Sequence, residues 1–176
     1  MPRNTYLHHR VLHSAHDMPD PGLSHISIGV RNYDVSKAFY TAVLETIGLR
    51  LVYDSETKPT HGEAEAENEA KSEDDNNKGR KRTRTLGFGP DEAHETLNIF
   101  EFPDESAPLA PGPGFHLAFN APTRDAVIEF HARAVGFGGS DNGLPGLRKQ
   151  YGETYFAAFV VDPDGWRLEA VCKNET

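Results

Sequence analysis

The chain has 176 residues, and its 18 lysines and arginines are outnumbered by 27 aspartates and glutamates, which gives a formal net charge of −9. This length suits one domain with a hydrophobic core, and the negative charge argues against a protein that binds nucleic acid or an anionic membrane through its overall charge. The single cysteine, Cys172, excludes an internal disulfide and a CxxC motif, so any metal must be held by histidine and carboxylate side chains.

The sequence contains neither a membrane span nor an export signal. No apolar stretch approaches the roughly 18 residues that a membrane span needs, and the N-terminus lacks the apolar core of a signal peptide. We therefore expect a cytoplasmic protein without a membrane partner.

Two segments are too polar to join a core. Residues 1–21 hold four histidines without apolar periodicity and are predicted to form a flexible N-terminal extension. An acidic run at 63–75 is followed by a basic run at 78–84, with no large apolar side chain among them, so we predict a disordered insertion over about residues 56–83. The basic run resembles a nuclear localisation signal and leaves nuclear entry possible, although a solvated loop is the favoured interpretation.

The remaining residues contain an internal repeat with an offset of 91 positions. Residues 24–30 alternate between polar and apolar side chains as a half-buried strand does, and residues 115–120 do the same. His25 and His116 occupy the same place in the two units. After each strand we predict an amphipathic helix, the first with its cap signal at Asp34 and the second at Thr123. The helices are expected to end at the two glycines that follow their apolar stripes, Gly48 and Gly136.

Three strand-like segments follow each predicted helix. They cover residues 49–53, 83–88 and 96–102 in the first unit, and 146–151, 155–161 and 166–172 in the second. A tight turn is predicted at the Asp-Pro-Asp-Gly sequence of residues 162–165. The pattern predicts an α+β fold made of two βαβββ modules, which are residues 22–103 and 113–173 of a single domain that covers residues 22–173.

Each unit has one carboxylate in its otherwise apolar last strand, Glu101 in the first and Glu169 in the second. Glu101 follows His25 by 76 residues and Glu169 follows His116 by 53, and the difference is close to the length of the insertion. A pseudo-twofold arrangement of the units would bring two imidazoles and two carboxylates together. Such a set suits a divalent Zn, Ni, Co, Mn or Fe ion and leaves room for water or substrate. A shift of one residue in the register would turn Glu101 to the other face.

Several motifs resemble one known group of proteins. The sequences HISIGV (25–30), AFYTAVLETIGLRLVYDS (38–55), FHLAFNAP (115–122) and DPDGWRLEAV (162–171) are similar to the vicinal oxygen chelate superfamily, which includes glyoxalase I, extradiol dioxygenases, and fosfomycin and bleomycin resistance proteins. The resemblance covers about residues 22–173 apart from the insertion, and its C-terminal part is similar to a branch of small glyoxalase-like proteins. It implies a glyoxalase-like fold, in which the two modules form a cupped mixed sheet and the first and last strands of each module supply the metal ligands.

The resemblance also implies a reaction. Carried over by position, the ligands are His25, Glu101, His116 and Glu169, and this full set is similar to bacterial-type glyoxalase I. It favours a lyase or isomerase that acts on a small dicarbonyl or its thiol adduct, with Glu169 as the base and Glu101 as the second candidate.

Three further residues lie in a segment that would border the cleft and orient the substrate, namely Arg148, Tyr151 and Tyr155. Two alternatives stay open: an iron-dependent extradiol dioxygenase, which needs only two histidines and one glutamate, and a binding or resistance protein without catalysis. The resemblance further implies a homodimer, in which the modules pair either within one chain or across two.

Overall fold

The structure is a computed structural model that describes residues 23–57, 82–104 and 108–175. The predicted extension at 1–21 and most of the predicted insertion at 56–83 therefore lie outside the described residues.

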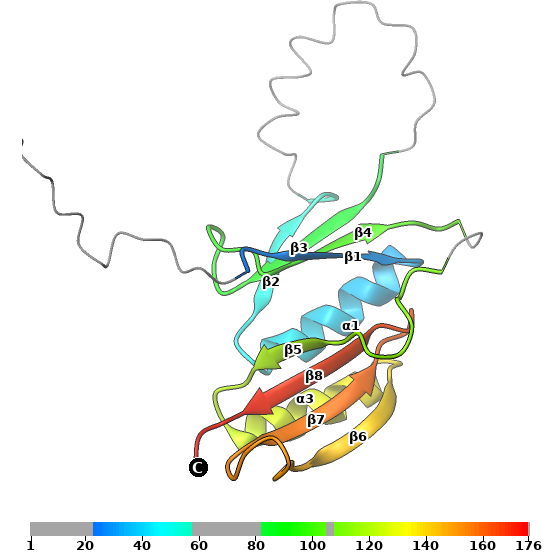
Figure 1. Cartoon of the computed structure of the whole chain (residues 1–176). Helices are drawn as coiled ribbons and strands as arrows, with labels where there is room; N and C mark the ends of the chain where they lie inside the picture. Colours follow the sequence, from blue (N-terminus) through cyan, green and yellow to red (C-terminus); the bar gives the residue numbers. More distant parts are fainter. Residues whose placement is uncertain (1–22, 58–81, 105–107, 176) are drawn as a thin grey trace, which may run out of the picture.

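Both units fold as βαβββ modules, as predicted, and together they give the α+β fold expected (Figure 1). Module one contains β1 (Ile26–Val30), α1 (Tyr33–Glu45), β2 (Arg50–Asp54), β3 (Thr85–Gly89) and β4 (Leu97–Glu101). Module two contains β5 (Leu117–Asn120), α3 (Arg124–Gly136), β6 (Ser140–Leu147), β7 (Phe156–Val161) and β8 (Arg167–Cys172). The sheets have the orders β1-β4-β3-β2 and β5-β8-β7-β6. In each, the first and last strands of the module run parallel and the other neighbours run antiparallel.

Short polar side chains start both helices. Thr123 caps α3 as predicted, because its hydroxyl accepts a hydrogen bond from the backbone N–H of Ala126. The cap of α1 is Asn32, whose side chain accepts from the N–H of Val35, and the predicted cap residue Asp34 lies in the first helical turn instead. An acidic residue is favourable there because the helix N-terminus carries partial positive charge.

Each predicted helix end is confirmed in part. α1 ends earlier than predicted, at Glu45, but Gly48 takes a φ of 85° after it, in the left-handed region that the predicted cap requires. In module two the helix ends at Gly136 as predicted, but the residue with positive φ is Gly138, at 98°. The C-cap is Phe137, whose N–H bonds to the carbonyl of Arg133 and so satisfies one of the final carbonyl groups.

The strand predicted at 146–151 is misplaced. β6 covers Ser140–Leu147, a segment rich in glycine and proline whose sequence is typical of a turn. It pairs with the apolar strand β7, and the register shifts between Asp141 and Gly143 and again between Gly143 and Gly146. Pairing with β7 therefore overrides the weak strand propensity of this segment.

β2 and β3 are antiparallel neighbours, and the residues that follow β2 and precede β3 border the undescribed residues 58–81. Beyond the last pair of the ladder, the N–H of Ser55 donates to the carbonyl of Thr85 at 3.0 Å, and the Ser55 hydroxyl accepts from the N–H of Thr85 at 2.9 Å. Arg82 adds a hydrogen bond from its guanidinium to the carbonyl of Ser55 at 2.9 Å. The two ends are thus fixed at the spacing of paired strands.

One face of each sheet is covered by helix, and both covered faces belong to one hydrophobic core. Buried side chains of β1, β4 and β8 alternate with more polar ones, so that Ile28, Ile99, Leu168 and Ala170 enter the core. Figure 1 shows the two sheets one above the other, with β1 and β5 on either side of the boundary between them and α3 behind the lower sheet. The helices α1 and α3 contact each other.

Buried polar contacts join the two modules. The hydroxyl of Tyr40 in α1 donates to Asp162 Oδ2, in the turn before β8, at 2.6 Å, and both residues are buried. Burial raises the pKa of Asp162 to about 6, against the effect of its hydrogen bonds from Tyr40 and Trp166. Close by, the indole N–H of Trp166 donates to the carbonyl of Gly29 in β1 at 2.8 Å.

The face of each sheet that points away from the helices is here called the open face. Alternation along the strands places Ser27 and Asn98 on the open face of module one, and Ala118 and Glu169 on that of module two. No helix in the described parts of the chain is long and apolar enough to cross a membrane.

Candidate functional site

The open face of module two brings together three residues that the sequence predicts for the site. The imidazole of His116 lies against Glu169, with 2.9 Å between His116 Nε2 and Glu169 Oε2. The hydroxyl of Tyr155 donates a hydrogen bond to the other carboxylate oxygen, Glu169 Oε1, at 2.7 Å. Only 3% of the Glu169 side chain is exposed, against 46% of His116, so a nearly buried carboxylate lies beneath an accessible imidazole.

Strand pairing explains this arrangement. β5 and β8 are parallel, and Ala118 pairs with Glu169. Because side chains alternate along a strand, His116, two residues before Ala118, projects from the same face as Glu169. On the other side, Phe159 of β7 pairs with Glu169, and its ring centroid lies 6.4 Å from that of His116. The carboxylate is therefore flanked by an imidazole and an aromatic ring.

Tyr155 is a proton donor at neutral pH. Burial raises its pKa to about 12, together with the hydrogen bond to Glu169 and the negative charge of that residue. The hydroxyl therefore stays protonated and holds one oxygen of Glu169 in place, while His116 holds the other.

Positive and aromatic groups surround the pair. The guanidinium of Arg148 lies 5.5 Å from the ring centroid of Phe159, and the ring of Tyr151 lies 5.4 Å from that of Tyr155. The ammonium group of Lys173 lies 5.6 Å from the Tyr155 ring on this rim. The structure thus places the three predicted substrate-binding residues, Arg148, Tyr151 and Tyr155, around His116 and Glu169.

In module one, the strand register identifies the counterpart of Glu169 as Asn98. Ile26 pairs with Leu97 in β4, just as Leu117, which lies 91 positions after Ile26, pairs with Leu168 in β8. The residue after Leu97 therefore corresponds to the residue after Leu168. The side-chain oxygen Oδ1 of Asn98 is buried and has no hydrogen-bond partner.

Glu101 does not occupy the place that the sequence prediction gave it. It pairs with Val30, three residues beyond Asn98, and therefore lies on the face covered by the helix. Its carboxylate accepts hydrogen bonds from Arg84 Nε at 2.8 Å, from Arg84 Nη2 at 2.6 Å, and from the N–H of Tyr33 at the start of α1 at 3.1 Å. The alignment of Glu101 with Glu169 is corrected accordingly, and with it the choice of Glu101 as a metal ligand and second candidate base.

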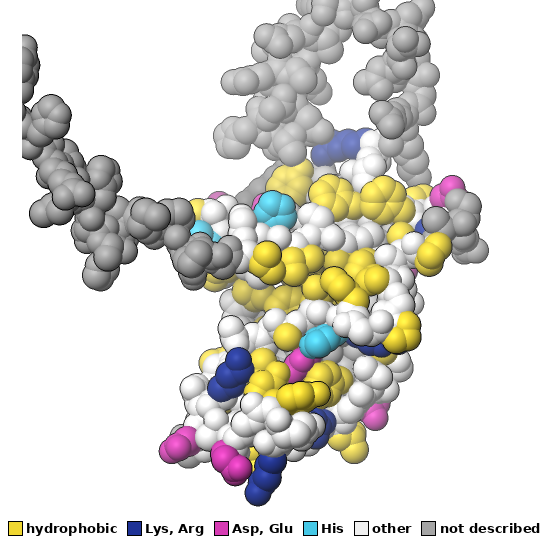
Figure 2. Space-filling model, in the orientation of Figure 1, with side chains coloured by type: hydrophobic (Ala, Val, Ile, Leu, Met, Phe, Trp, Pro, Cys, Tyr) yellow, Lys and Arg dark blue, Asp and Glu magenta, His cyan; other side chains and the backbone are white. Residues whose placement is uncertain are grey.

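His25 is exposed at the entrance to β1, and its Nδ1 lies 3.4 Å from the hydroxyl of Ser24. The four predicted ligands therefore do not assemble in one chain, and no group of three or more histidine, cysteine, aspartate or glutamate side chains suited to a metal occurs among the described residues. On the face drawn in Figure 2, histidine side chains lie in separate places, and the lower one adjoins an acidic side chain.

Sequence reasoning missed Asn98, and the local pattern could not have decided between it and Glu101. Leu97-Asn98-Ile99 shares the order apolar, polar, apolar with Leu168-Glu169-Ala170, but so does Phe100-Glu101-Phe102. The alignment on Glu101 matched the residue type instead, and the unknown length of the connection between β2 and β3 left both choices open.

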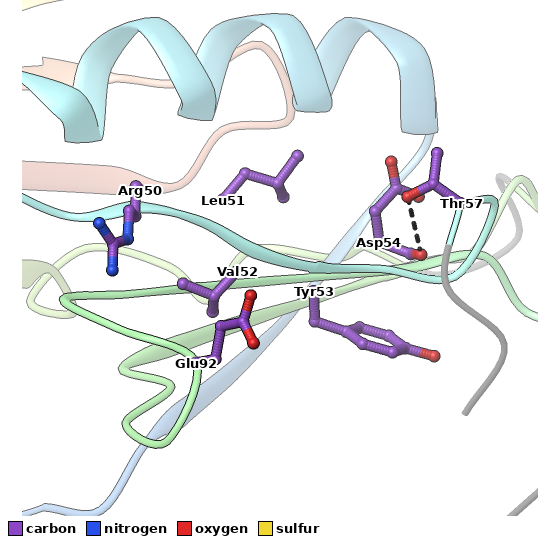
Figure 3. A pocket seen from close by; sticks show the side chains of 7 residues that line it. All are labelled: Arg50, Leu51, Val52, Tyr53, Asp54, Thr57 and Glu92. Carbon is purple, nitrogen blue, oxygen red and sulfur yellow. Dashed lines mark hydrogen bonds between the residues drawn. The ribbon is translucent and has the colours of Figure 1, made fainter. Parts of the chain in front are cut away.

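A separate hollow of about 170 Å³ lies beside β2 (Figure 3) and contains none of the predicted site residues. The carboxylates that line it are those of Asp54 and Glu92. Asp54 accepts a hydrogen bond from Lys37 at 2.6 Å and another from the hydroxyl of Tyr33. Although burial opposes ionisation, these bonds lower the pKa of Asp54. Both oxygens of the carboxylate are used in hydrogen bonds within the fold.

Solved structures with this fold come from several organisms. A glyoxalase/bleomycin resistance protein from Albidiferax ferrireducens is 24% identical, with a TM-score of 0.58 over 85% of this chain and 98% of that one. A mutant of glyoxalase I from Zea mays is 17% identical, with a TM-score of 0.59 over 87% of this chain and 47% of that one. The fosfomycin resistance protein FosX from Mesorhizobium loti is 18% identical, with a TM-score of 0.53 over 87% and 92% of the two chains.

These likenesses establish the fold, and the family follows from the sequence itself. No curated protein matches the sequence. The profile of the Glyoxalase/Bleomycin resistance protein/Dioxygenase superfamily matches residues 22–170, which is most of the chain and includes both modules. The chain therefore belongs to the Glyoxalase/Bleomycin resistance protein/Dioxygenase superfamily.

Proposed function

We propose that this chain is a metal-dependent lyase or isomerase of the glyoxalase type, which acts on a small substrate with two adjacent oxygen atoms, such as a dicarbonyl or its thiol adduct. The observation that carries the proposal is the contact of His116 and Tyr155 with Glu169 on an open face. Superfamily membership and the likeness to maize glyoxalase I support it.

The donor set fits a divalent metal. Two imidazoles and one carboxylate, from His25, His116 and Glu169, match Zn, Ni, Co, Mn or Fe in hardness. At the position equivalent to Glu169, module one has Asn98 instead of a carboxylate, so the three protein donors leave the amide oxygen of Asn98 for the substrate. A bound ion would polarise the two substrate oxygens and stabilise negative charge on them.

The chain's own residues supply the proton transfer and the orientation. Glu169 is our candidate base, and it accepts the substrate proton once an oxygen is released from His116 or Tyr155. Tyr155, with its pKa of about 12, holds the other oxygen without giving up its proton. Arg148 is placed on the rim to orient an anionic end of the substrate.

We further propose that two copies of the chain complete the site. Within one chain no third histidine or acidic side chain among the described residues joins His116 and Glu169. Both His116 and His25 are exposed, so module one of a second copy can place its His25 over the pair. This arrangement would be an isologous homodimer with two equal sites.

One observation favours a second candidate function. With Asn98 at the position equivalent to Glu169, the set becomes two histidines and one carboxylate, which is typical of non-heme iron oxygenases. An iron-dependent extradiol dioxygenase is therefore the alternative reaction.

The first test is metal content, measured by mass spectrometry on the untagged full chain. We expect about one divalent ion per chain, lost in His116→Ala and Glu169→Gln and kept in the control His94→Ala, whose exposed histidine contacts Asp91 in the turn before β4. Isomerisation of a methylglyoxal–thiol adduct supports the lyase, and oxygen uptake with catechol supports the alternative. Absence of metal from the wild-type chain, together with a failure to take up added Ni, Zn or Fe, would overturn both and leave a binding protein.

The second test distinguishes sites within a chain from sites across a dimer. His25→Ala and His116→Ala chains are unfolded together, refolded as a mixture, and assayed for metal. If two copies share each site, half of the dimers are mixed and hold one intact site, so about a quarter of the wild-type metal returns. No recovery, from a mixture shown to contain mixed dimers, would place each site within one chain.

A further inference from the structure

The two open faces differ beside the residues that correspond, Asn98 and Glu169. In module two, Phe159 of β7 pairs with Glu169 and covers that position with its ring. In module one, the residue that pairs with Asn98 in the same way is Gly87 of β3. Since glycine has no side chain, module one leaves a space where module two has an aromatic ring.

A carboxylate occupies this space. A Cβ atom placed on Gly87 would lie 2.9 Å from both the carboxyl carbon and Oε1 of Glu95 and 3.0 Å from Cβ of Tyr53. Glu95 comes from the turn before β4, and its side chain is partly buried. Its carboxylate therefore lies over the open face, between Tyr53 on β2 and the neighbouring position of Asn98 on β4.

The Glu95 carboxylate and the Asn98 side chain thus occupy neighbouring positions of the open face. Paired positions of antiparallel strands have Cβ atoms about 5 Å apart, so the Glu95 carboxylate above Gly87 is a neighbour of the Asn98 side chain. Asn98 Oδ1 is buried and unpartnered, and no hydrogen bond or ion pair to the Glu95 carboxylate occurs within the described part of the chain. Buried acceptors are rarely left without a donor, so such atoms usually have a partner that is not part of the fold.

We propose that Glu95 and Asn98 form a subsite on module one that binds a primary ammonium or amidinium group of the substrate. The carboxylate supplies the opposite charge, the amide oxygen supplies a second acceptor, and Tyr53 supplies an aromatic wall. The proposal rests on the proposed function only in taking the open face as the substrate surface. It adds a class of substrate, one that carries a cationic group.

The test uses three probes of one shape and different charge, benzylamine, benzyl alcohol and benzoate, in the presence of a chelator, so that failure of metal binding has no effect on it. Binding is followed by the amide resonances of Gly87, Tyr53 and the Asn98 side chain. We expect benzylamine to bind at least about fivefold more tightly than benzyl alcohol, and benzoate to cause no shift at these residues.

Two variants and a control locate the effect. Glu95→Gln keeps the shape and removes the charge, and Gly87→Ala keeps the charge and displaces the carboxylate, so both are expected to reduce benzylamine affinity at least about fivefold. Glu175→Gln, which removes one charge from the exposed C-terminal end, should bind like the wild type. Equal affinity for benzoate and benzylamine, or unchanged binding in a folded Glu95→Gln protein, would overturn the proposal.

Discussion

Replacing Glu101 with glutamine tests whether this carboxylate belongs to the fold or to the site. The side chain is 8% exposed, and among the described residues it accepts two hydrogen bonds from Arg84 and one from the N–H of Tyr33. Glutamine keeps one acceptor oxygen and turns an NH2 group toward a donor. The variant therefore loses one charge-assisted bond, and in the bonds that remain only the Arg84 guanidinium still carries a charge.

The expected loss of stability follows from these contacts. Hydrogen bonds to a charged group contribute about 1.5–3 kcal/mol each and neutral ones about 1 kcal/mol. Since 29% of the Arg84 side chain is exposed, water replaces part of what is lost, and we expect a decrease of about 2–3 kcal/mol in the free energy of unfolding. For a chain of this size that corresponds to a Tm lower by about 5–10 °C.

The assay combines urea denaturation with metal content. Glu101→Gln should lose stability and keep whatever metal the wild type binds, whereas Glu169→Gln should lose the metal. A double-mutant cycle with Arg84→Gln should give a coupling energy above about 1 kcal/mol, since the two side chains are in direct contact. The reasoning would be refuted by a Glu101→Gln chain that is as stable as the wild type and cannot hold metal.

Three further outcomes are expected from the buried polar groups. Folding raises the pKa of Asp162 from 3.8 to about 6, so the folded state binds more protons than the unfolded state between these pH values. The free energy of unfolding should therefore fall by up to about 3 kcal/mol as the pH rises from 4 to 6.5. Asp162→Asn should flatten this dependence in a series of urea denaturations at different pH. Tyr40→Phe removes a donor from a buried carboxylate and should lower the free energy of unfolding by about 1–3 kcal/mol at pH 7.5, where a loss under 0.5 kcal/mol would contradict the assignment. Tyr155 should ionise near pH 12 in a spectrophotometric titration. In Glu169→Gln its pKa should move toward 10, while burial keeps it above that value. The same titration curve in both proteins would show that the Glu169 carboxylate does not affect the Tyr155 hydroxyl.

The fold was predictable because the two modules repeat the same sequence pattern. The offset of 91 residues between His25 and His116 also relates the strands β1 and β5, and apolar periodicity marked both helices. β6 could not be placed from its sequence, because its pairing with β7 comes from tertiary contact and its own residues favour a turn. The shift of the cap from Asp34 to Asn32 is a boundary error of two residues, within the usual spread of helix ends.

The grouping of the candidate residues was predictable only within module two. His116, Glu169 and Tyr155 lie on neighbouring strands of module two, whose connections are short, so spacing fixed their relation. In module one the long connection before β3 hid the register, and a carboxylate with three donors on the covered face was taken for the equivalent of Glu169. Only strand pairing distinguishes Asn98 from Glu101, because both are polar residues in an apolar strand.

The hydrogen bonds that join Ser55 and Thr85 are expected to make the chain tolerant of insertions and deletions between β2 and β3. They fix the ends of β2 and β3 at the spacing of a hairpin, so the sheet does not depend on what connects them. Each doubling in the length of a flexible connection costs only about 0.6 kcal/mol. A short Gly-Ser turn in place of residues 58–81, or a small foreign domain inserted there, is therefore expected to leave the strand register intact, which makes this position the natural place to attach a reporter without touching either open face.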